Sequence, residues 1–409
     1  MQSVLPARVP ITRYLALSAY WFGFSFHWFF LLPLLMPADV ERLVGATQKG
    51  AYLGWLAGAS ALIPLLLPPF LGAWSDRIGK RMVFLLAGTV VNVAGLAVML
   101  IARDFALYVI GYLLVQLGNA VASSPYTALI PDVVPQSERG RASGVMGFFQ
   151  LFSQIAGGLT AFALGGSRDG QYLAIIAVLT VTTLITYLSI REPGIKHEPA
   201  RMSLKTYLEP PYHDFRWVFL TRAFTETGRY AVQPFLAFYL ADVIGKFEIL
   251  GFTIEGSSLA LTLLLILLSV TAAITAVVSG SWSDRIGKRP VVLIASLAMS
   301  VAALGFALSK SYELAILMGL AFGLGYGAFV SVDWALGTSV LPFPQHHARD
   351  MGVWHVAMVF PQLFQGIFGQ LLDAGNASSK NGGYPLLFGI AVVFFVLGGA
   401  FISKVRGVR

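Results

Sequence analysis

The sequence contains no cysteine and few charged residues, and both absences narrow what the chain can be. Without cysteine it has no disulfide bond, no thiolate nucleophile and no cysteine-ligated metal site. Charged residues make up 12% of the 409 residues, whereas soluble domains carry about 25%. Because so few charges cannot cover a surface that faces water, we expect the outer surface to face lipid.

Motifs of the common enzyme classes are also absent. The sequence has no HExxH, GxSxG or Walker loop, the patterns of zinc peptidases, serine hydrolases and nucleotide-binding loops. We therefore expect neither an enzyme nor a bound cofactor or metal ion. Transport by this chain would depend on a gradient of substrate or of an ion, not on ATP.

Apolar residues make up 56% of the sequence, and they gather in long runs. A helix of about 20 apolar residues crosses about 30 Å of hydrocarbon. Runs such as 259–278 are continuous rather than alternating, so we expect an all-α membrane protein and not a barrel of strands. The expected spans are residues 13–36, 50–72, 81–102, 105–128, 142–165, 171–190, 216–241, 257–280, 290–308, 312–337, 351–372 and 384–403.

The longest polar connection, residues 191–215, contains four prolines and follows the sixth span. It predicts two six-helix bundles, residues 1–190 and 216–409, joined by this linker. With both termini in the cytoplasm, 19 of the 28 Lys and Arg residues lie on the cytoplasmic side. Anionic lipid therefore accounts for the net charge of +8 without nucleic acid. We expect a monomeric, multi-pass protein of a bacterial inner (plasma) membrane, whose first apolar run is a spanning helix rather than a signal peptide.

A charged decapeptide occurs twice between apolar runs. Residues 72–81 read GAWSDRIGKR, and residues 280–289 differ only in having Ser281 in place of Ala73. The offset of 208 residues also aligns Gly144 with Gly352 and Gln154 with Gln362. Since an even number of spans separates the copies, the repeat is parallel, which predicts a binding site at the membrane midplane between the halves.

The decapeptide resembles the loop between helices 2 and 3 of the major facilitator superfamily, and its second copy resembles the loop between helices 8 and 9. The resemblance covers the whole chain and implies two six-helix bundles related by a parallel pseudo-two-fold axis. In that family the loops act as cytoplasmic gates that form in one state of the transport cycle and break in the other. The implied gate residues are Asp76, Arg77, Gly79, Arg81, Asp284, Arg285, Gly287 and Arg289. Alternatively, their Lys and Arg residues only fix the orientation in the membrane.

Residues 325–342 are similar to helix 10 of the glycoside–pentoside–hexuronide/cation symporters and the sucrose/proton symporters. The sodium-coupled melibiose carriers of that group have acidic residues inside the N-terminal half, and here the first six spans have none in their interiors. A proton thus fits better than sodium, although another cation stays open. Drug/proton antiporters share a Gly- and Pro-rich motif on helix 5, and residues 147–158 lack the proline.

The seventh span has the densest polar side chains. Arg222, Glu226 and Arg229 share one helical face, and charges at membrane depth mark a polar cavity or a partner. With two arginines against one glutamate, we expect an unsatisfied positive charge. Arg229 would bind substrate oxygens, aided by Tyr230 and Gln233, while Glu226 holds Arg229 or carries a proton. The alternative is a neutral pair kept for packing.

Asp333 is the other acidic residue expected within the membrane. It is a candidate for proton coupling, and alternatively a gate residue that pairs with Arg285 or Arg289. Further candidates for substrate binding are aromatic residues, which stack on sugar rings, and amides, which bind hydroxyl groups. They are Tyr20, Phe24, His27, Gln116, Asn119, Gln150, Gln154, His355 and Gln362. Each could instead only hold helices together.

These observations predict a secondary transporter that moves a small polar organic solute, a sugar or glycoside first, by proton-coupled alternating access. Efflux of an amphipathic or drug-like compound is the second hypothesis. A membrane receptor that keeps the fold without transport is the third, and the two intact loops disfavour it.

Overall fold

The computed structural model describes residues 10–134, 139–192, 209, 212–340, 353–354 and 356–406. The chain divides into two compact units, Met1–Asp39 with Ser60–Pro199, and Val40–Ala59 with Ala200–Arg409. In the first unit the helices are α1 (Ile11–Phe30), the π-helical turn η1 (Leu31–Leu35), the start of α2 (Met36–Val44), α4 (Leu62–Ile78), α5 (Arg81–Ile101), α6 (Phe105–Val133), α7 (Arg139–Ala163) and α8 (Arg168–Ser189).

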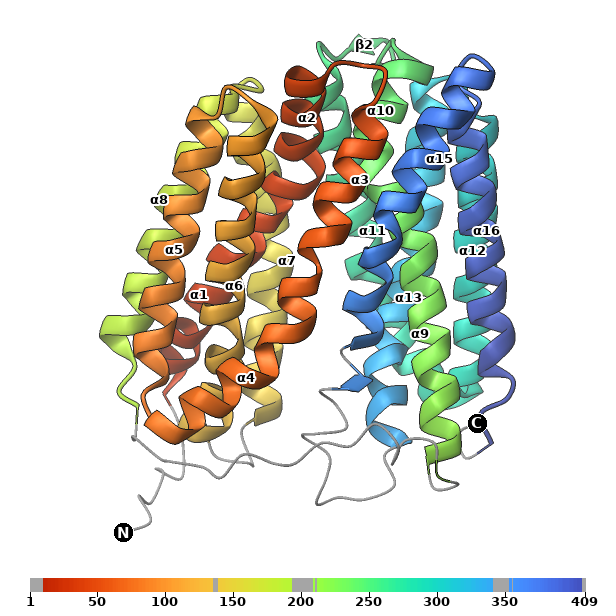
Figure 1. Cartoon of the computed structure of the whole chain (residues 1–409). Coiled ribbons are helices and arrows are strands. Elements are labelled where there is room, and N and C mark those ends of the chain that lie inside the picture. The colour runs from red at the N-terminus through yellow and green to blue at the C-terminus, as the bar shows by residue number, and fades with distance from the viewer. Residues whose placement is uncertain are drawn as a thin grey trace. The chain divides into compact units, whose positions relative to one another are not determined.

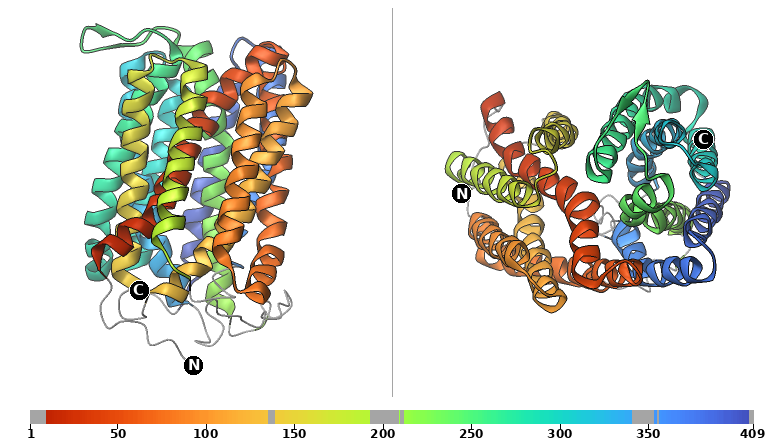
Figure 2. Two further views of the ribbon diagram at one scale, coloured as in Figure 1. Left: turned by 90° about the vertical axis from the view of Figure 1, so that its left-hand side faces the viewer. Right: turned by 90° about the horizontal axis from the view of Figure 1, so that it is seen from above.

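The second unit begins with the rest of α2 and with α3 (Lys49–Ser60). Its other elements are α9 (His213–Val232), η5 (Gln233–Phe235), α10 (Leu236–Tyr239), η6 (Leu240–Ile244), β1 (Glu248–Ile249), β2 (Phe252–Thr253), α11 (Ser257–Ile286), α12 (Lys288–Leu308), α13 (Tyr312–Ser339), η8 (Phe360–Phe364), α15 (Gln365–Ser378) and α16 (Gly383–Ile402). The strands form an antiparallel hairpin at the end of this unit opposite the C-terminus (Figure 2).

In the described part of the chain, nine helices are long and apolar enough to cross a membrane. The first runs over Ile11–Val44, past the predicted end at residue 36, because the helix continues through η1 into α2. The remaining three expected spans fall on α7, whose apolar part is the shorter Phe148–Ala163, on α9 to α10, and on η8 with α15. Charged residues on α9 explain why its sequence is less apolar than the others.

Glycines on α5 and α6 bring these two helices of the first unit into backbone contact (Figure 1). A Cβ atom added to Gly88 would lie 2.5 Å from the backbone nitrogen of Ala122, and one added to Gly118 would lie 2.4 Å from that of Asn92. Small residues permit such contacts between membrane helices. Next to this glycine seam, the Asn92 amide donates to the side-chain oxygen of Asn119.

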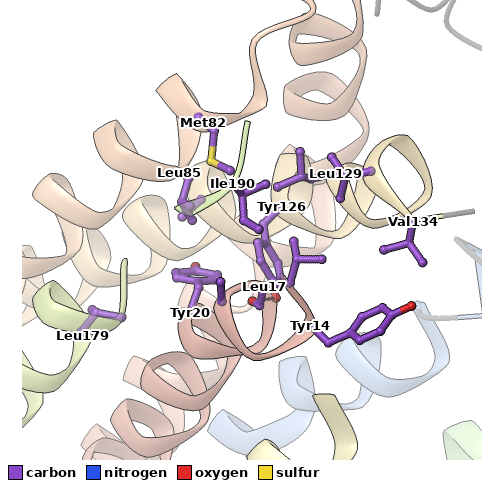
Figure 3. Packing of buried hydrophobic residues seen from close by; sticks show 13 residues of the cluster. Tyr14, Leu17, Tyr20, Met82, Leu85, Tyr126, Leu129, Val134, Leu179 and Ile190 are labelled. Carbon is purple, nitrogen blue, oxygen red and sulfur yellow. Dashed lines mark hydrogen bonds between the residues drawn. The ribbon is translucent and has the colours of Figure 1, made fainter. Parts of the chain in front are cut away.

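Buried apolar residues from α1, α5, α6 and α8 pack together in one cluster of the first unit (Figure 3). Within it the rings of Tyr20 and Tyr126 lie 4.7 Å apart between centroids. The Tyr126 hydroxyl donates to the backbone oxygen of Leu17 at 2.6 Å, which satisfies its polar tip away from water. Figure 3 shows Leu17 and Tyr20 of α1 on either side of this ring. The contact fixes α1 against α6.

Candidate functional site

Helix α9 carries an ion pair within the seventh expected span. Two guanidinium nitrogens of Arg229 lie 2.7 and 2.6 Å from one carboxylate oxygen of Glu226. Arg229 also donates to the side-chain oxygen of Gln233, and its guanidinium carbon lies 4.1 Å from the ring centroid of Tyr230. On η8, Gln362 donates to the Tyr230 hydroxyl at 2.8 Å. These five residues form one hydrogen-bonded group, here called the α9 cluster.

The two ions of the α9 cluster differ in exposure. The side chain of Glu226 is 4% exposed and that of Arg229 is 16% exposed. Gln233 and Gln362 are half-buried, as is Tyr326 of α13, whose ring centroid lies 5.8 Å from the guanidinium carbon of Arg229. A solute would therefore reach Arg229 and the two amides more readily than the carboxylate.

A second ion pair joins α9 to α13 in the same unit. Arg222 donates to Asp333, and both side chains are buried. The guanidinium carbon of Arg222 lies 3.4 Å from a ring centroid of Trp354, and one of its nitrogens lies 3.4 Å from the sulfur of Met358. Asp333 thus pairs with Arg222, and the expectation that it pairs with Arg285 or Arg289 is wrong. The side chain of Arg285 is exposed.

Together the two pairs balance the charge of the helix interior. The sequence suggested an unsatisfied positive charge, because it placed two arginines against Glu226 alone. The structure corrects this, since Asp333 supplies the second carboxylate. A buried charge without a partner costs several kcal/mol, roughly 3–5 when one partner is removed. The four groups consequently form a neutral set in which the loss of any member leaves a buried ion.

The first unit presents an uncharged surface of aromatic rings and an amide. The ring of Trp21 stacks on Phe24 and on Tyr126, with centroid distances of 5.1 and 6.1 Å. Its indole nitrogen donates to the side-chain oxygen of Gln150 on α7 at 3.4 Å. Trp21 and Phe24 are half-buried, and Gln150 is exposed. Such a surface, here called the Trp21 surface, can stack on an apolar ring face and bind a hydroxyl group.

The structure places several other predicted site residues inside the packing of the first unit. Tyr20 is 1% exposed and packs on Tyr126, and His27 is fully buried with neither ring nitrogen bonded to a described residue. Gln116 donates to Ser60 and to Tyr112, and Asn119 accepts from Asn92. These contacts favour the packing interpretation of the four residues. Gln154 is half-buried on α7, and His355 lies outside the described residues.

The first copy of the repeated loop ends α4 and begins α5. Gly79 has φ +70° and its backbone nitrogen donates to Ser75, a helix end that favours glycine. The buried Arg81 donates to Asp132 of α6 and to Ser75, both at 2.9 Å. Glu192 accepts from the backbone nitrogens of Arg81 and Met82 and caps α5.

In the second copy, Gly287 has φ +93° and lies between α11 and α12. Arg77 of the first copy and Arg285 of the second are exposed. The side chains of Asp76 and Asp284 lie outside the described residues. Their assignment as gate residues therefore stays a prediction.

Sequence reasoning missed four residues that these sites use. Trp354 lies on Arg222, and Trp21 stacks on the predicted site residue Phe24. Asp132 and Glu192 hold the first loop. Asp132 could have been suspected, because it is an acidic residue just beyond the fourth expected span, on the side expected to hold the basic loop. Within the described ranges, no group of three or more His, Asp or Glu residues is arranged to hold a metal ion.

Comparison with known proteins agrees with this architecture. Residues 13–245 and 218–408 match the Major Facilitator Superfamily. The multi-drug resistance efflux pump PmrA of Streptococcus pneumoniae is 26% identical over 86% of both chains. The sucrose transport protein SUT2 of Oryza sativa is 26% identical over 46% of this chain and 45% of its own.

A solved bacterial homologue of the human lysosomal transporter Spinster superposes with a TM-score of 0.74, covering 98% of each chain at 18% identity. A peptide transporter in complex with sulfate gives 0.75 at 13% identity. The folds therefore agree at low sequence identity. With the family match along nearly its whole length and twelve helical segments in two units, the chain belongs to the Major Facilitator Superfamily and is a membrane transporter, not an enzyme.

Proposed function

We propose that this transporter moves a small polar organic solute, a sugar or glycoside first, together with a proton. The observation that carries the proposal is the α9 cluster, in which a nearly enclosed carboxylate holds a more accessible guanidinium. Protonation of Glu226 removes the charge that binds Arg229. Arg229 can then donate to solute oxygens, so proton and solute bind in the same state.

The substrate class is inferred from both units, each taken separately. The Trp21 surface offers stacked rings and the Gln150 amide, and the α9 cluster offers Arg229, Gln233 and Gln362. Sugars need apolar stacking on one ring face and hydrogen bonds to several hydroxyl groups. SUT2 is named as a sucrose transporter, which supports the same class.

Efflux of drug-like compounds is the second candidate. PmrA, named as a multi-drug efflux pump, aligns with 86% of this chain, whereas SUT2 aligns with 46%. Against it, an efflux pump for lipophilic cations would be expected to expose an acidic group, and the two acids of the charged set are bound by arginines.

We place the protein in the inner membrane with both termini cytoplasmic, as a monomer of bundles 1–190 and 216–409.

A ligand screen with the purified protein tests the proposal. We expect mono- and disaccharides or glycosides to raise the thermal midpoint, and to do so more strongly at acidic than at alkaline pH. In proteoliposomes the same ligands should accumulate when the exterior is acidified, and the accumulation should stop when a protonophore is added. Stabilisation by lipophilic cations alone would favour efflux instead.

A further inference from the structure

Trp354 is in direct contact with the buried guanidinium of Arg222, and the proposed transport does not use it. It is fully buried, and its ring lies 3.4 Å from the guanidinium carbon of Arg222. Arg222 has three contacts of different kinds, with the carboxylate of Asp333, the sulfur of Met358 and the face of Trp354. Its remaining nitrogen, Nε, is buried without a partner in the described part of the chain.

These contacts respond differently to the charge of Asp333. The charge–charge attraction to the carboxylate ends when Asp333 takes up a proton, and only a weaker hydrogen bond to its carbonyl oxygen can remain. The attraction between a guanidinium and an indole face arises from the ring quadrupole and does not depend on that proton. The contact with the sulfur of Met358 is likewise unaffected. Arg222 therefore keeps its contacts with the Trp354 ring and the Met358 sulfur at full strength when Asp333 is neutral, while its contact with Asp333 becomes weaker.

The position of the indole is set by α13, the helix that carries Asp333. A Cβ atom added to Gly337 would lie 2.8 and 2.9 Å from two atoms of the Trp354 ring. Gly337 follows Asp333 by four residues, so the two positions share one face of the helix. The same face thus supplies the carboxylate and the space in which the indole lies.

We propose that Trp354 is a positioning residue that retains the Arg222 guanidinium when Asp333 becomes neutral during the transport cycle. The inference rests on the proposed proton coupling and goes beyond it. Without the indole, neutralisation of Asp333 would leave the buried cation with a thioether and an uncharged carboxyl as its partners among the described residues. Arg222 would then be free to leave its position beside α13, and the neutral set of four charged groups would lose its arrangement.

A double-mutant cycle on the purified protein tests the contact without a transport assay. Asp333→Asn imitates the neutral acid, and Trp354→Leu removes the ring face but stays apolar. We expect Trp354→Leu to lower the thermal midpoint more in the Asp333→Asn background than in the wild type, and Trp354→Phe to restore most of the loss in both. Additive effects, or equal effects of Leu and Phe, would overturn the proposal.

Gly337→Ala provides a second route should the double variant fail to fold. It displaces the indole without changing its chemistry, so the loss should again be larger beside Asp333→Asn. Gly389→Ala is the matched control, because no atom lies within 4 Å of a Cβ added there. An equal loss in both backgrounds for Gly337→Ala contradicts the proposal.

Transport assays then connect the contact to function. Trp354→Leu should reduce proton-driven accumulation by about tenfold, the effect of losing a desolvated cation–π contact, while Trp354→Phe keeps it within about twofold. Equal accumulation by Leu and Phe variants would reject the positioning role. If the wild type shows no proton-driven accumulation, the proposed function fails, and the stability cycle still decides whether Trp354 retains Arg222.

Discussion

The two copies of the decapeptide have nearly the same sequence but different surroundings. In the first unit Arg81 is buried against Asp132, and Glu192 caps the helix that follows. The positions 208 residues further on are Val340 and Ala400, neither of which carries a charge. In the second unit the Nε of Arg289 is buried without a partner among the described residues. Two loops of nearly the same sequence thus differ in their contacts: Arg81 of the first is paired with Asp132, and Arg289 of the second has one nitrogen without a partner among the described residues.

The helix interiors differ in the opposite sense. The first unit has the uncharged Trp21 surface, and the second has four ions in two pairs. The ion pairs of the first unit thus lie at helix ends, Arg81 with Asp132 at the loop and Asp39 with Arg168 at the start of α8, whereas the second unit has two pairs along α9. We infer that the first unit contributes recognition by shape and the second contributes the response to protons.

The largest effect is expected from Glu226→Gln. It removes the charge that holds Arg229, so proton-driven accumulation should fall by about 100-fold or more, the size of a lost general acid–base group. Counterflow of solute without a proton gradient should survive. The measurement is solute uptake into proteoliposomes, with Glu248→Gln on the exposed hairpin as control. Undiminished uphill uptake would show that Glu226 does not couple transport to protons. It would also count against the inference that the second unit contributes the response to protons.

Next in size is the difference between Arg81→Met and Arg289→Met. The first takes a charged partner from the carboxylate of Asp132, which is 11% exposed, and should cost about 3 kcal/mol. The second removes a guanidinium whose Nε has no partner in the described part of the chain, and it should cost less. Thermal midpoints of the two purified variants compare them directly. Equal losses would show that the two corners are equivalent after all.

A smaller effect is expected at the Trp21 surface. Trp21→Leu should raise the KM for a sugar by about tenfold with little change in the maximal rate, because it removes a stacking face and no charge. Trp21→Phe should keep KM within about threefold. Quenching of tryptophan fluorescence by the solute should shrink in both variants. A change confined to the maximal rate would assign Trp21 to another step.

The smallest effect concerns the cap of α5. Glu192→Gln keeps an acceptor for the backbone nitrogens of Arg81 and Met82 but loses the charge at the helix start. A loss of about 1 kcal/mol in stability is expected, with transport unchanged. Ala400, which lies 208 residues further on, is inside α16 and has no side-chain acceptor, so Ala400→Gln should produce no comparable loss. The comparison can be made by thermal unfolding in detergent.

Much of the fold could be predicted from the sequence. The apolar runs and the repeat predicted a helical membrane fold of two halves, and the resemblance of the decapeptides implied its family. The extension of the first helix to Val44 was missed, since Asp39, Glu41 and Arg42 interrupt the apolar pattern there. In the structure Asp39 is buried and paired with Arg168 of α8.

Less of the candidate site could be predicted. Glu226, Arg229, Tyr230 and Gln233 are close in sequence on one helix, so helical spacing was enough to group them. The partner of Arg222 is 111 residues away, and no spacing rule connects such positions. The role of the aromatic residues was harder still to predict. Tyr20 and Trp21 are neighbours in sequence, but Tyr20 is buried in the packing and Trp21 is half-buried.

The glycine seam between α5 and α6 has a practical consequence. Because backbone meets backbone along it, these two helices cannot slide past one another without collisions of main-chain atoms. We therefore expect α5 and α6 to move together as one rigid pair. Spectroscopic labels on the exposed positions Val83 and Leu117 should keep a constant separation throughout the transport cycle. Distances measured from either label to any other helix can then be read as motion of that helix alone.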